Sequence, residues 1–212
     1  MVGKVTDNCK ASASLLPGIM GHSQWSTPNE TLALVKSHID GTADPWEGNE
    51  ATEWGNRLEP VVIDEVARRL NIRDYNKDIT YAIKHGTLEL EASLDCEAVG
   101  QGQIIRTDPE NGIYCMGAEQ ISLDGPGCIE SKVTSYRPED VPDMGRGPLQ
   151  LQGQMDCGNF SWGVLGILYQ GTALRCFVFV PHAATVAAIS DAVLDFDQRL
   201  RSDPVRWYDI EN

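Results

Sequence analysis

The chain has 212 residues and a formal net charge of −14, with 31 acidic against 17 basic side chains. Its hydrophobic share of 42% suffices for a sizeable core and excludes a disordered polymer. No run of about 18 apolar residues is present, which argues against a membrane span. The acidic balance is unusual for a protein that contacts phosphates, although net charge governs long-range steering rather than the lining of one groove.

The length predicts a single domain over residues 1–212, with the weakly patterned residues 1–16 as a possible N-terminal arm. The first residues lack the apolar centre of a secretory signal, so we expect a cytoplasmic protein. Six cysteines show no C-x-x-C spacing and are expected to be reduced and mostly buried. This spacing counts against an iron–sulfur or zinc site.

Two helices are predicted in the first third of the chain. Thr27 and Glu30 have the spacing of a capping box, with Pro28 at the first helical position. A second helix is predicted over residues 50–70, where apolar residues recur at helical spacing. Pro60 lies inside this segment and predicts a kink or a new helical start.

Strand patterns dominate the middle of the chain and helices close it. The predicted strands cover residues 79–83, 88–99, 103–106, 113–116 and 128–134. A helix is predicted over residues 148–157, a hairpin over 161–169 and 172–180, and a last amphipathic helix over 183–200. The order predicts an α/β or α+β fold, in which helices flank a central mixed sheet.

Three charged residues on predicted strands are the first candidates for chemistry. Glu130 and Lys132 are two apart, so their side chains share one face of a strand. Alone, such a pair is typical of a solvated surface. Asp95 lies on an upstream strand pattern, where Glu91 and Glu97 share its face and stay open as alternatives. Two carboxylates can hold a hard divalent cation through oxygen, and a lysine can orient the attacking water.

Two further motifs flank these residues. Trp54 and Gly55 precede Glu59 in the second predicted helix. Three glutamines alternate in the helix predicted after the Glu130 strand, namely Gln150, Gln152 and Gln154. The ordered set resembles the phage lambda exonuclease family, also called YqaJ-type viral recombinases, within the PD-(D/E)xK nucleases. The resemblance covers residues from about 18 to about 200. The chain differs in having Cys96 after Asp95, where the family usually has glycine.

The resemblance implies a restriction-endonuclease-like core and a metal-dependent exodeoxyribonuclease. Such an enzyme digests double-stranded DNA from an end, 5′ to 3′, in phage-type recombination or DNA repair. The implied cofactor is Mg²⁺ or Mn²⁺, and the implied ligands are Asp95, Glu130, the Ser131 carbonyl and Glu59. Lys132 would act on the attacking water or on the developing charge.

The same resemblance assigns the remaining site residues and partners. The family pattern points to the second glutamine, Gln152, as an active-site residue, whereas Gln150 and Gln154 share a different helical face. Ser23, just before the first helix, is the candidate for binding a DNA 5′-phosphate. The implied assembly is a homotrimeric ring around DNA, acting with a single-strand annealing protein.

Two other functions stay open. One is a structure-specific or restriction-type endonuclease on the same fold, which would cut closed circular DNA. The other is a catalytically silent DNA-binding module, which would bind no divalent cation through Glu130.

Overall fold

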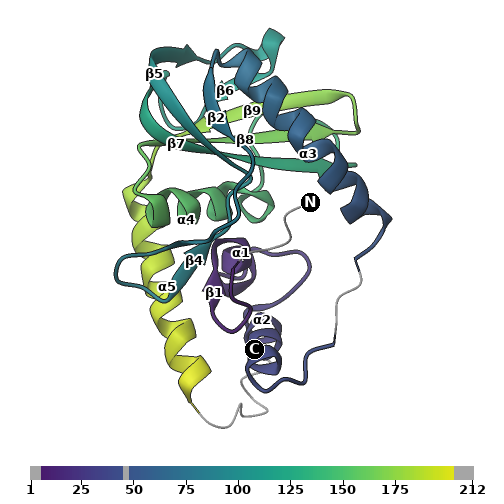
Figure 1. Ribbon diagram of the computed structural model, residues 1–212, viewed down its shortest axis with the longest axis vertical. Coiled ribbons are helices and arrows are strands. Elements are labelled where there is room, and N and C mark those ends of the chain that lie inside the picture. The colour runs from purple at the N-terminus through teal and green to yellow at the C-terminus, as the bar shows by residue number, and fades with distance from the viewer. Residues whose placement is uncertain (1–5, 45–47, 203–212) are drawn as a thin grey trace.

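The computed structural model describes residues 6–44 and 48–202 of the chain. A six-stranded sheet forms one end of the molecule, and a three-stranded sheet lies below it (Figure 1). The large sheet has the order β2 (Asp74–Asn76), β5 (Cys96–Arg106), β7 (Gln120–Thr134), β8 (Trp162–Tyr169), β9 (Ala173–Phe179) and β6 (Ile113–Cys115). The small sheet has the order β1 (Ala11–Ser12), β4 (Leu90–Ala92) and β3 (Ile83–Lys84).

Helices cover the sheets and connect them. The α-helices are α1 (Leu16–Ile19), α2 (Pro28–Ile39), α3 (Glu50–Arg69), α4 (Pro148–Gly158) and α5 (Ala183–Arg201). Short 3₁₀ turns are η1 (Ala13–Leu15), η2 (Pro109–Asn111) and η3 (Met144–Arg146). None of the helices in the described part of the chain combines the length and apolar character that a membrane span needs.

The large sheet is mixed, as predicted. β7 pairs with β8 in parallel and with β5 in antiparallel orientation. β9 is antiparallel to β8 and parallel to β6. Helices flank this sheet, so the predicted α+β fold is confirmed. Parallel neighbouring strands need a crossover connection. α4 lies in the connection between β7 and β8.

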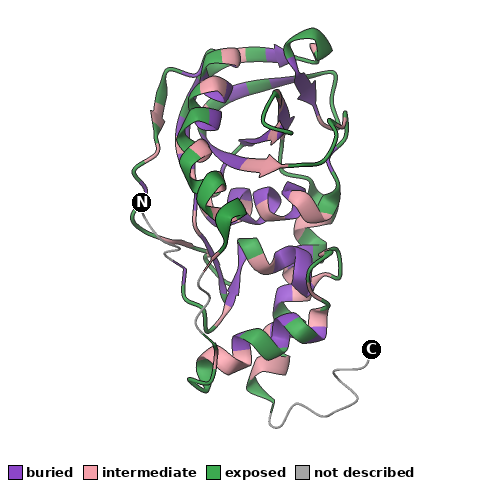
Figure 2. Cartoon of the chain, turned by 90° about the vertical axis from the view of Figure 1, so that its right-hand side faces the viewer, coloured by how far each residue is buried: buried purple, intermediate pink, exposed green. Residues whose placement is uncertain are grey.

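The two faces of the large sheet are buried in separate hydrophobic clusters. Ile129 and Val164 pack with Val62 and Val66 of α3. Their strand neighbours, such as Cys128, Leu165 and Ile167, face the cluster that contains α4 and α5. This alternation follows from the two-residue period of a strand. α4 is buried along most of its length and lies between the large sheet and the lower half of the molecule (Figure 2).

Several predicted elements are confirmed. The capping box of α2 is present: Glu30 N donates to Thr27 Oγ1 over 3.3 Å, and Thr27 N donates to Glu30 Oε2 over 2.8 Å. The hairpin, α4 and α5 lie within two residues of their predicted bounds. α3 runs through Pro60 as one helix, so a new helical start at this proline does not occur.

The predicted strand over residues 88–99 is wrong as a single element. The chain pairs in the small sheet as β4, leaves it at Ser93 and enters the large sheet as β5 at Cys96. The alternation of apolar residues is typical of a strand both before and after the break, and it does not indicate which sheet each part joins. Alternation therefore cannot be counted across this break, from Glu91 to Asp95 and Glu97.

Other predicted strands differ in extent. Only Ile83 of the predicted strand 79–83 is in a strand, and β2 was not predicted. β7 begins at Gln120, earlier than the predicted residue 128. Gly125, Pro126 and Gly127 are atypical of a strand interior, so the sequence pattern did not indicate the first half of this strand.

The segment expected to be an arm belongs, from residue 11 on, to the core. Ala11, Ala13 and Leu16 are 2%, 1% and 0% exposed. A Cβ added at Gly153 of α4 would lie 2.4 Å from Leu16 Cδ1, so this helix and the N-terminal segment are in close contact. Residues 1–5 lie outside the described residues. Five of the six cysteines are buried and all are free, in agreement with the prediction.

Candidate active site

Glu130 is the centre of a buried polar cluster at the middle of the large sheet. It belongs to β7, and the residue is only 1% exposed. Its Oε1 accepts a hydrogen bond from Gln150 Nε2 over 2.7 Å, and its Oε2 accepts one from Gln154 Nε2 over 2.6 Å. Lys132 Nζ, two residues along the strand, also contacts Oε1. A buried carboxylate is stable only with such partners.

Asp95 joins this cluster from the neighbouring strand. Cys96 pairs with Ile129 in the antiparallel β5–β7 ladder, so the preceding residue falls beside Glu130 and Ser131. Asp95 Oδ2 accepts a hydrogen bond from Ser131 N over 2.8 Å. Burial, and next the negative charge of Glu130, raise the pKa of Asp95 to about 8. The strand pairing thus joins two motifs that are 35 residues apart.

Lys132 supplies the positive charge in the cluster. Burial acts against its ammonium, but the carboxylates of Glu130 and Asp95 outweigh burial and raise the pKa of Lys132 above its ordinary value. Its side chain is 36% exposed, so the amine reaches from buried Glu130 toward solvent. A charged lysine at this position can meet a substrate group that carries negative charge.

Glu59 lies on α3, before the buried residues of that helix. It is only partly buried. Burial and then the charge of Glu130 raise the pKa of Glu59, while Lys132 lowers it. Burial is the main cause of the raised pKa values of both carboxylates, Asp95 and Glu59, and the charge of Glu130 adds to it.

The donor set suits a hard divalent cation. Carboxylates of Asp95, Glu130 and Glu59, with the Ser131 carbonyl, are the oxygen ligands that Mg²⁺ and Mn²⁺ prefer. Among residues 6–44 and 48–202, no three His, Cys, Asp or Glu side chains are grouped as a ready metal site. Glu130 Oε1 is contacted by both Gln150 and Lys132, whereas Oε2 accepts one hydrogen bond, from Gln154. A cation bound through Oε1 would therefore have to displace one of these groups, and Oε2 keeps a lone pair for a ligand bond.

The glutamines of α4 divide into two groups. Gln150 and Gln154 are four residues apart, share one face of the helix and both donate to Glu130. Gln152 points elsewhere: its Nε2 donates to Val180 O over 3.0 Å, and its Oε1 accepts from His182 N over 2.9 Å. The structure therefore places the predicted Gln152 outside the cluster and brings in the other two glutamines. The i, i+4 spacing was the sequence signal for that pair.

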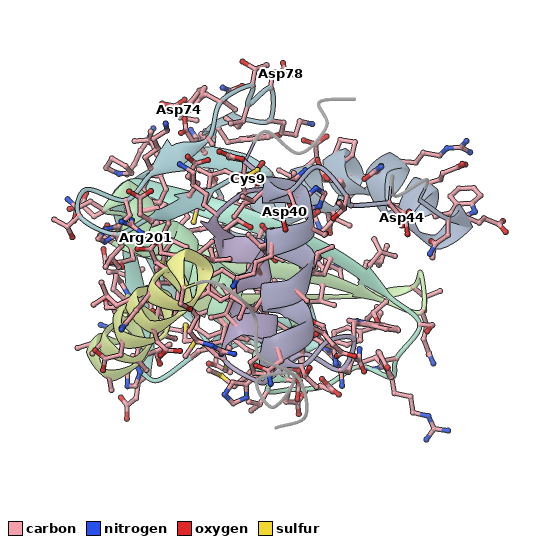
Figure 3. The ribbon with its side chains drawn as sticks, turned by 90° about the horizontal axis from the view of Figure 1, so that it is seen from below. Cys9, Asp40, Asp44, Asp74, Asp78 and Arg201 are labelled. Atoms are coloured by element: carbon pink, nitrogen blue, oxygen red, sulfur yellow. The ribbon has the colours of Figure 1, made fainter. Side chains whose placement is uncertain are left out.

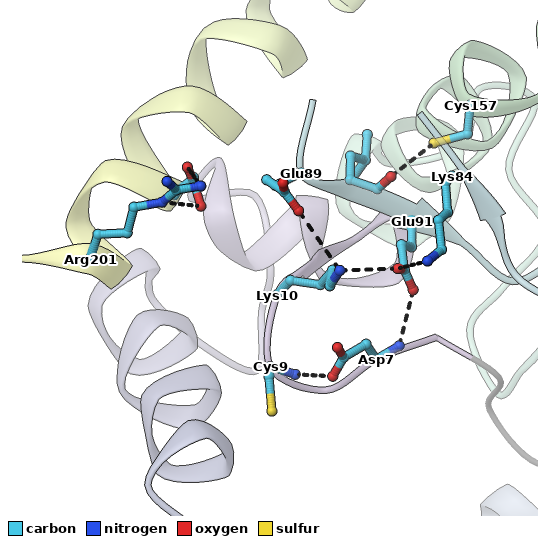
Figure 4. Close-up of polar contacts among 10 residues, drawn as sticks. Asp7, Cys9, Lys10, Lys84, Glu89, Glu91, Cys157 and Arg201 are labelled. Atoms are coloured by element: carbon cyan, nitrogen blue, oxygen red, sulfur yellow. Dashed lines mark hydrogen bonds and ion pairs between the residues drawn. The ribbon is translucent and has the colours of Figure 1, made fainter. Parts of the chain in front are cut away.

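The side chains of the two alternatives to Asp95 are engaged in other contacts. Glu91 in β4 binds Asp7 N and forms ion pairs with Lys10 and Lys84, which Figure 4 shows on the small sheet. Glu97 lies one residue beyond Cys96 on β5 and accepts a hydrogen bond from Tyr81 Oη over 2.7 Å. Glu97 also pairs with the strand of Glu130, opposite Cys128. The side chain of Asp95, by contrast, accepts a hydrogen bond from Ser131 N, next to Glu130.

A pocket of about 340 Å³ opens beside the cluster. Lys132 and Gln150 line it on one side, and Ser23, from the loop before α2, lines it on another. Ser23 Oγ accepts a hydrogen bond from Trp25 N over 3.0 Å. The structure thus brings the predicted phosphate-binding serine to the same pocket as the catalytic lysine candidate.

Several basic residues in the middle of the chain are already paired with carboxylates. Arg68 and Arg69 pair with Glu65, Lys77 pairs with Asp64, and Lys84 pairs with Glu91. Acidic residues are dispersed over the surface: Asp40, Asp44, Asp74 and Asp78 are exposed on separate segments (Figure 3). The excess of negative charge is thus spread over the molecule and not confined to the Glu130 cluster.

The fold is similar to that of two exonucleases of known structure. LHK-Exo, an alkaline exonuclease from Laribacter hongkongensis solved also with dAMP, has a TM-score of 0.62 and 18% identity, over 91% of this chain and 88% of its own. A phage-related exonuclease from Haemophilus somnus 129PT has a TM-score of 0.57 and 12% identity, over 90% of this chain and 93% of its own. No curated protein matches the chain. The model of the YqaJ-like viral recombinase domain matches residues 8–137, and the chain belongs to this family.

Proposed function

We propose that the protein is a divalent-metal-dependent exodeoxyribonuclease that digests double-stranded DNA from an end, 5′ to 3′, in phage-type recombination or repair. Family membership and the exonuclease fold support a nuclease. The observation that carries the proposal is the contact between Asp95 and the Glu130 strand. It joins an acidic residue, a second carboxylate and a lysine in one buried cluster.

The carboxylates form the proposed metal site. Asp95, Glu130 and the Ser131 carbonyl would hold Mg²⁺ or Mn²⁺, and Glu59 would help to hold a second ion. When bound, such a cation polarises the scissile phosphate, activates water and neutralises the leaving oxygen. The closeness of the carboxylates supports this assignment: the charge of Glu130 adds to burial in raising the pKa of Asp95 and of Glu59, and a bound cation would offset both effects.

The other polar groups position the reactants. Lys132 orients the attacking water or stabilises charge that develops on the phosphate, since its ammonium is held beside Glu130 and reaches the pocket. Gln150 and Gln154 fix the Glu130 carboxylate by donating one hydrogen bond to each oxygen. Amides that orient a ligand carboxylate act in the way of outer-shell groups at known metal sites.

The pocket beside Lys132 is the proposed place for the end of the digested strand. Ser23 is our candidate for contacting a 5′-phosphate there. The dAMP in the LHK-Exo structure supports a nucleotide as a ligand of this fold. A homotrimeric ring and a single-strand annealing partner complete the proposal for the biological assembly.

Incubation with linear and closed circular duplexes tests the function, each with Mg²⁺, with Mn²⁺ and with a chelator. We expect metal-dependent loss of the linear DNA alone, and 5′-labelled ends to be released first. Cutting of the circular DNA would instead support an endonuclease.

Lys132→Ala tests the site itself. We expect cleavage to be abolished while folding and DNA binding persist, because the lysine is not part of the hydrophobic core. Lys84→Ala is the matched control, since this lysine is 75% exposed and pairs with Glu91. Equal turnover of both variants would contradict the assignment of the Glu130–Lys132 strand.

One observation favours a silent DNA-binding module as the second candidate. Both oxygens of Glu130 are hydrogen-bonded by protein groups in the described structure. Titration calorimetry with Mn²⁺ separates the two: we expect binding that Glu130→Gln removes, whereas a silent module would give no heat with either protein.

A further inference from the structure

Trp25 is the most exposed large hydrophobic side chain of the described residues. It is 85% exposed, whereas Trp162, in the core of the sheet, is 0% exposed. Isolated exposed apolar residues are common on protein surfaces, so exposure alone carries no function. Trp25 differs in its position, because it lines the same pocket as Lys132.

The backbone that carries Trp25 is fixed from several directions. His22 N and Ser23 N both donate to Pro17 O, over 2.7 and 2.9 Å. Trp25 N donates to Ser23 Oγ, and Tyr136 Oη donates to Gln24 Oε1 over 3.0 Å. The loop therefore holds the indole at the pocket without burying it. A side chain presented in this way needs little ordering when a ligand binds.

Tyr136 forms a second aromatic surface of the pocket. It is 42% exposed, and the Arg146 guanidinium lies 4.1 Å from its ring centroid. Arg146 is itself held by Glu139, with 3.3 Å between Nη1 and Oε1. The stacked arginine and the hydrogen bond to Gln24 fix the ring in place.

The pocket therefore combines an aromatic wall with polar groups near the reacting centre. Lys132, Ser23 and Gln150 provide polar contacts, and Trp25 and Tyr136 provide π-faces. Aromatic side chains beside a positively charged group are the usual means of binding single-stranded nucleotides without reading their sequence. The volume of about 340 Å³ lies in the range of small-ligand sites, ~300–1,000 Å³.

We propose that Trp25, with Tyr136, forms a stacking platform for the terminal nucleobase of the strand being digested. This inference rests on the proposed exonuclease function and extends it. The base lies against the indole while its phosphate faces Lys132. Since every base has a π-face, the platform holds any terminal nucleotide and lets the enzyme advance without sequence preference. Trp25 is a positioning residue and takes no part in the chemistry.

The test compares terminal nucleotides with and without a base. Duplexes carry a 5′-phosphate on either a normal nucleotide or an abasic tetrahydrofuran residue. Wild type, Trp25→Ala, Trp25→Phe and the control Trp54→Ala are assayed under single-turnover conditions. Trp54 is a tryptophan that is 50% exposed and does not line this pocket.

On the normal end we expect Trp25→Ala to weaken half-saturation by about 5- to 150-fold, the range of one base–aromatic stack, with little change in the maximal rate. Trp25→Phe should retain most of the affinity, and Trp54→Ala should behave as wild type. On the abasic end, wild type should lose affinity by a similar factor, and Trp25→Ala should lose nothing more. Equal losses on both ends, or no loss on the normal end, would overturn the platform.

Two further measurements keep this result separate from the proposed function. Fluorescence anisotropy of the same duplex ends in Ca²⁺ measures end binding without turnover. If wild type fails to digest DNA, the exonuclease proposal fails, and the anisotropy difference between normal and abasic ends still decides on stacking. Light scattering of Trp25→Ala reports on the other use of an exposed indole: a change in mass with unchanged end binding would make Trp25 a protein–protein contact and overturn the proposal.

Discussion

The candidate site depends on a few side chains whose charges do not balance. Asp95, Glu130 and Glu59 lie near one ammonium, that of Lys132, and burial together with the charge of Glu130 raises the pKa of Asp95 and of Glu59. Without a cation, these carboxylates lower the stability of the folded state at pH values where Asp95 is ionised. With a bound cation the same carboxylates become favourable.

Asp95 therefore links stability to pH. Its ordinary pKa is 3.8, and in the folded chain it is about 8. The folded state binds the extra proton between these values, so stability is fully present below the unfolded pKa and falls as pH rises through the folded one. In a chelator, we expect the Tm of wild type to fall relative to Asp95→Asn from about pH 4 to about pH 8, and the difference to level off above that.

Mn²⁺ should reverse this order of Tm values between wild type and Asp95→Asn. It stabilises the protein that binds it by mass action, so wild type should gain more than Asp95→Asn in thermal melts at neutral pH. Asp95→Asn should also be inactive, with Glu97→Gln as its active neighbour control. Activity in Asp95→Asn together with inactivity in Glu97→Gln or Glu91→Gln would mean that the wrong carboxylate was chosen.

At the scale of elements, α4 makes side-chain hydrogen bonds on two of its faces. Gln150 and Gln154 face the cluster on β7, and Gln152 bonds the chain between β9 and α5. The helix is buried nearly all round, so it has no solvent face to set its orientation. Its rotation places one glutamine pair at Glu130 and the middle glutamine away from it.

The glutamines should therefore respond differently to alanine. Gln154→Ala is expected to lower the rate about 10- to 100-fold, as for other groups that orient a metal ligand. Gln152→Ala leaves Val180 O and His182 N without partners, which should lower the free energy of unfolding by ~1–3 kcal/mol with near-normal activity per folded molecule. Kinetics and urea unfolding of both variants check this, and the reverse pattern would restore Gln152 to the site.

The N-terminal segment that ends at Leu16, the first residue of α1, is the second element with a clear consequence. Leu16 is 0% exposed and contacts α4, so Leu16→Ala should lower the free energy of unfolding by ~2–5 kcal/mol. Leu34→Ala is the control, since Leu34 is 50% exposed, and should change it by less than ~0.5 kcal/mol. Equal, small effects in denaturant unfolding would mean that the segment is a detached arm after all.

The sequence predicts local features well and spatial ones poorly. Glu130 and Lys132 share a face by a two-residue period, and α2 is marked by Thr27 and Glu30. The position of Asp95 beside Glu130 depends on the pairing of β5 with β7, a contact between distant segments that no local pattern contains. The rotation of α4 is likewise set by packing on both sides. The family pattern pointed to Gln152, and the observed hydrogen bonds involve its neighbours.

At the scale of the whole molecule, the excess of negative charge bears on how the protein binds DNA. The chain carries a formal net charge of −14, and many of its cations are paired with carboxylates, including Arg68, Lys77 and Arg146. Each contact with DNA phosphates should therefore be weak. Encircling the duplex is a way to stay bound without strong contacts, which is why we propose the trimer.

Light scattering tests the assembly. We expect a mass three times the 23.3 kDa of the chain, and loading onto DNA ends that weakens steeply as salt rises. A monomeric mass combined with processive digestion would contradict the ring. A monomer that releases DNA after each cut would favour the endonuclease.

The uneven burial of α3 has a consequence for how the site holds together. Its buried residues, Val62, Ile63, Val66 and Ala67, all follow Glu59, while β7 lies in the middle of the large sheet. Amide hydrogens around Glu130 should exchange with solvent only when the whole protein unfolds, and those of the first turns of α3 through local fraying. Glu59 lies between these exposed first turns and the buried part of α3, so we expect it to be held less firmly in the cluster than Glu130.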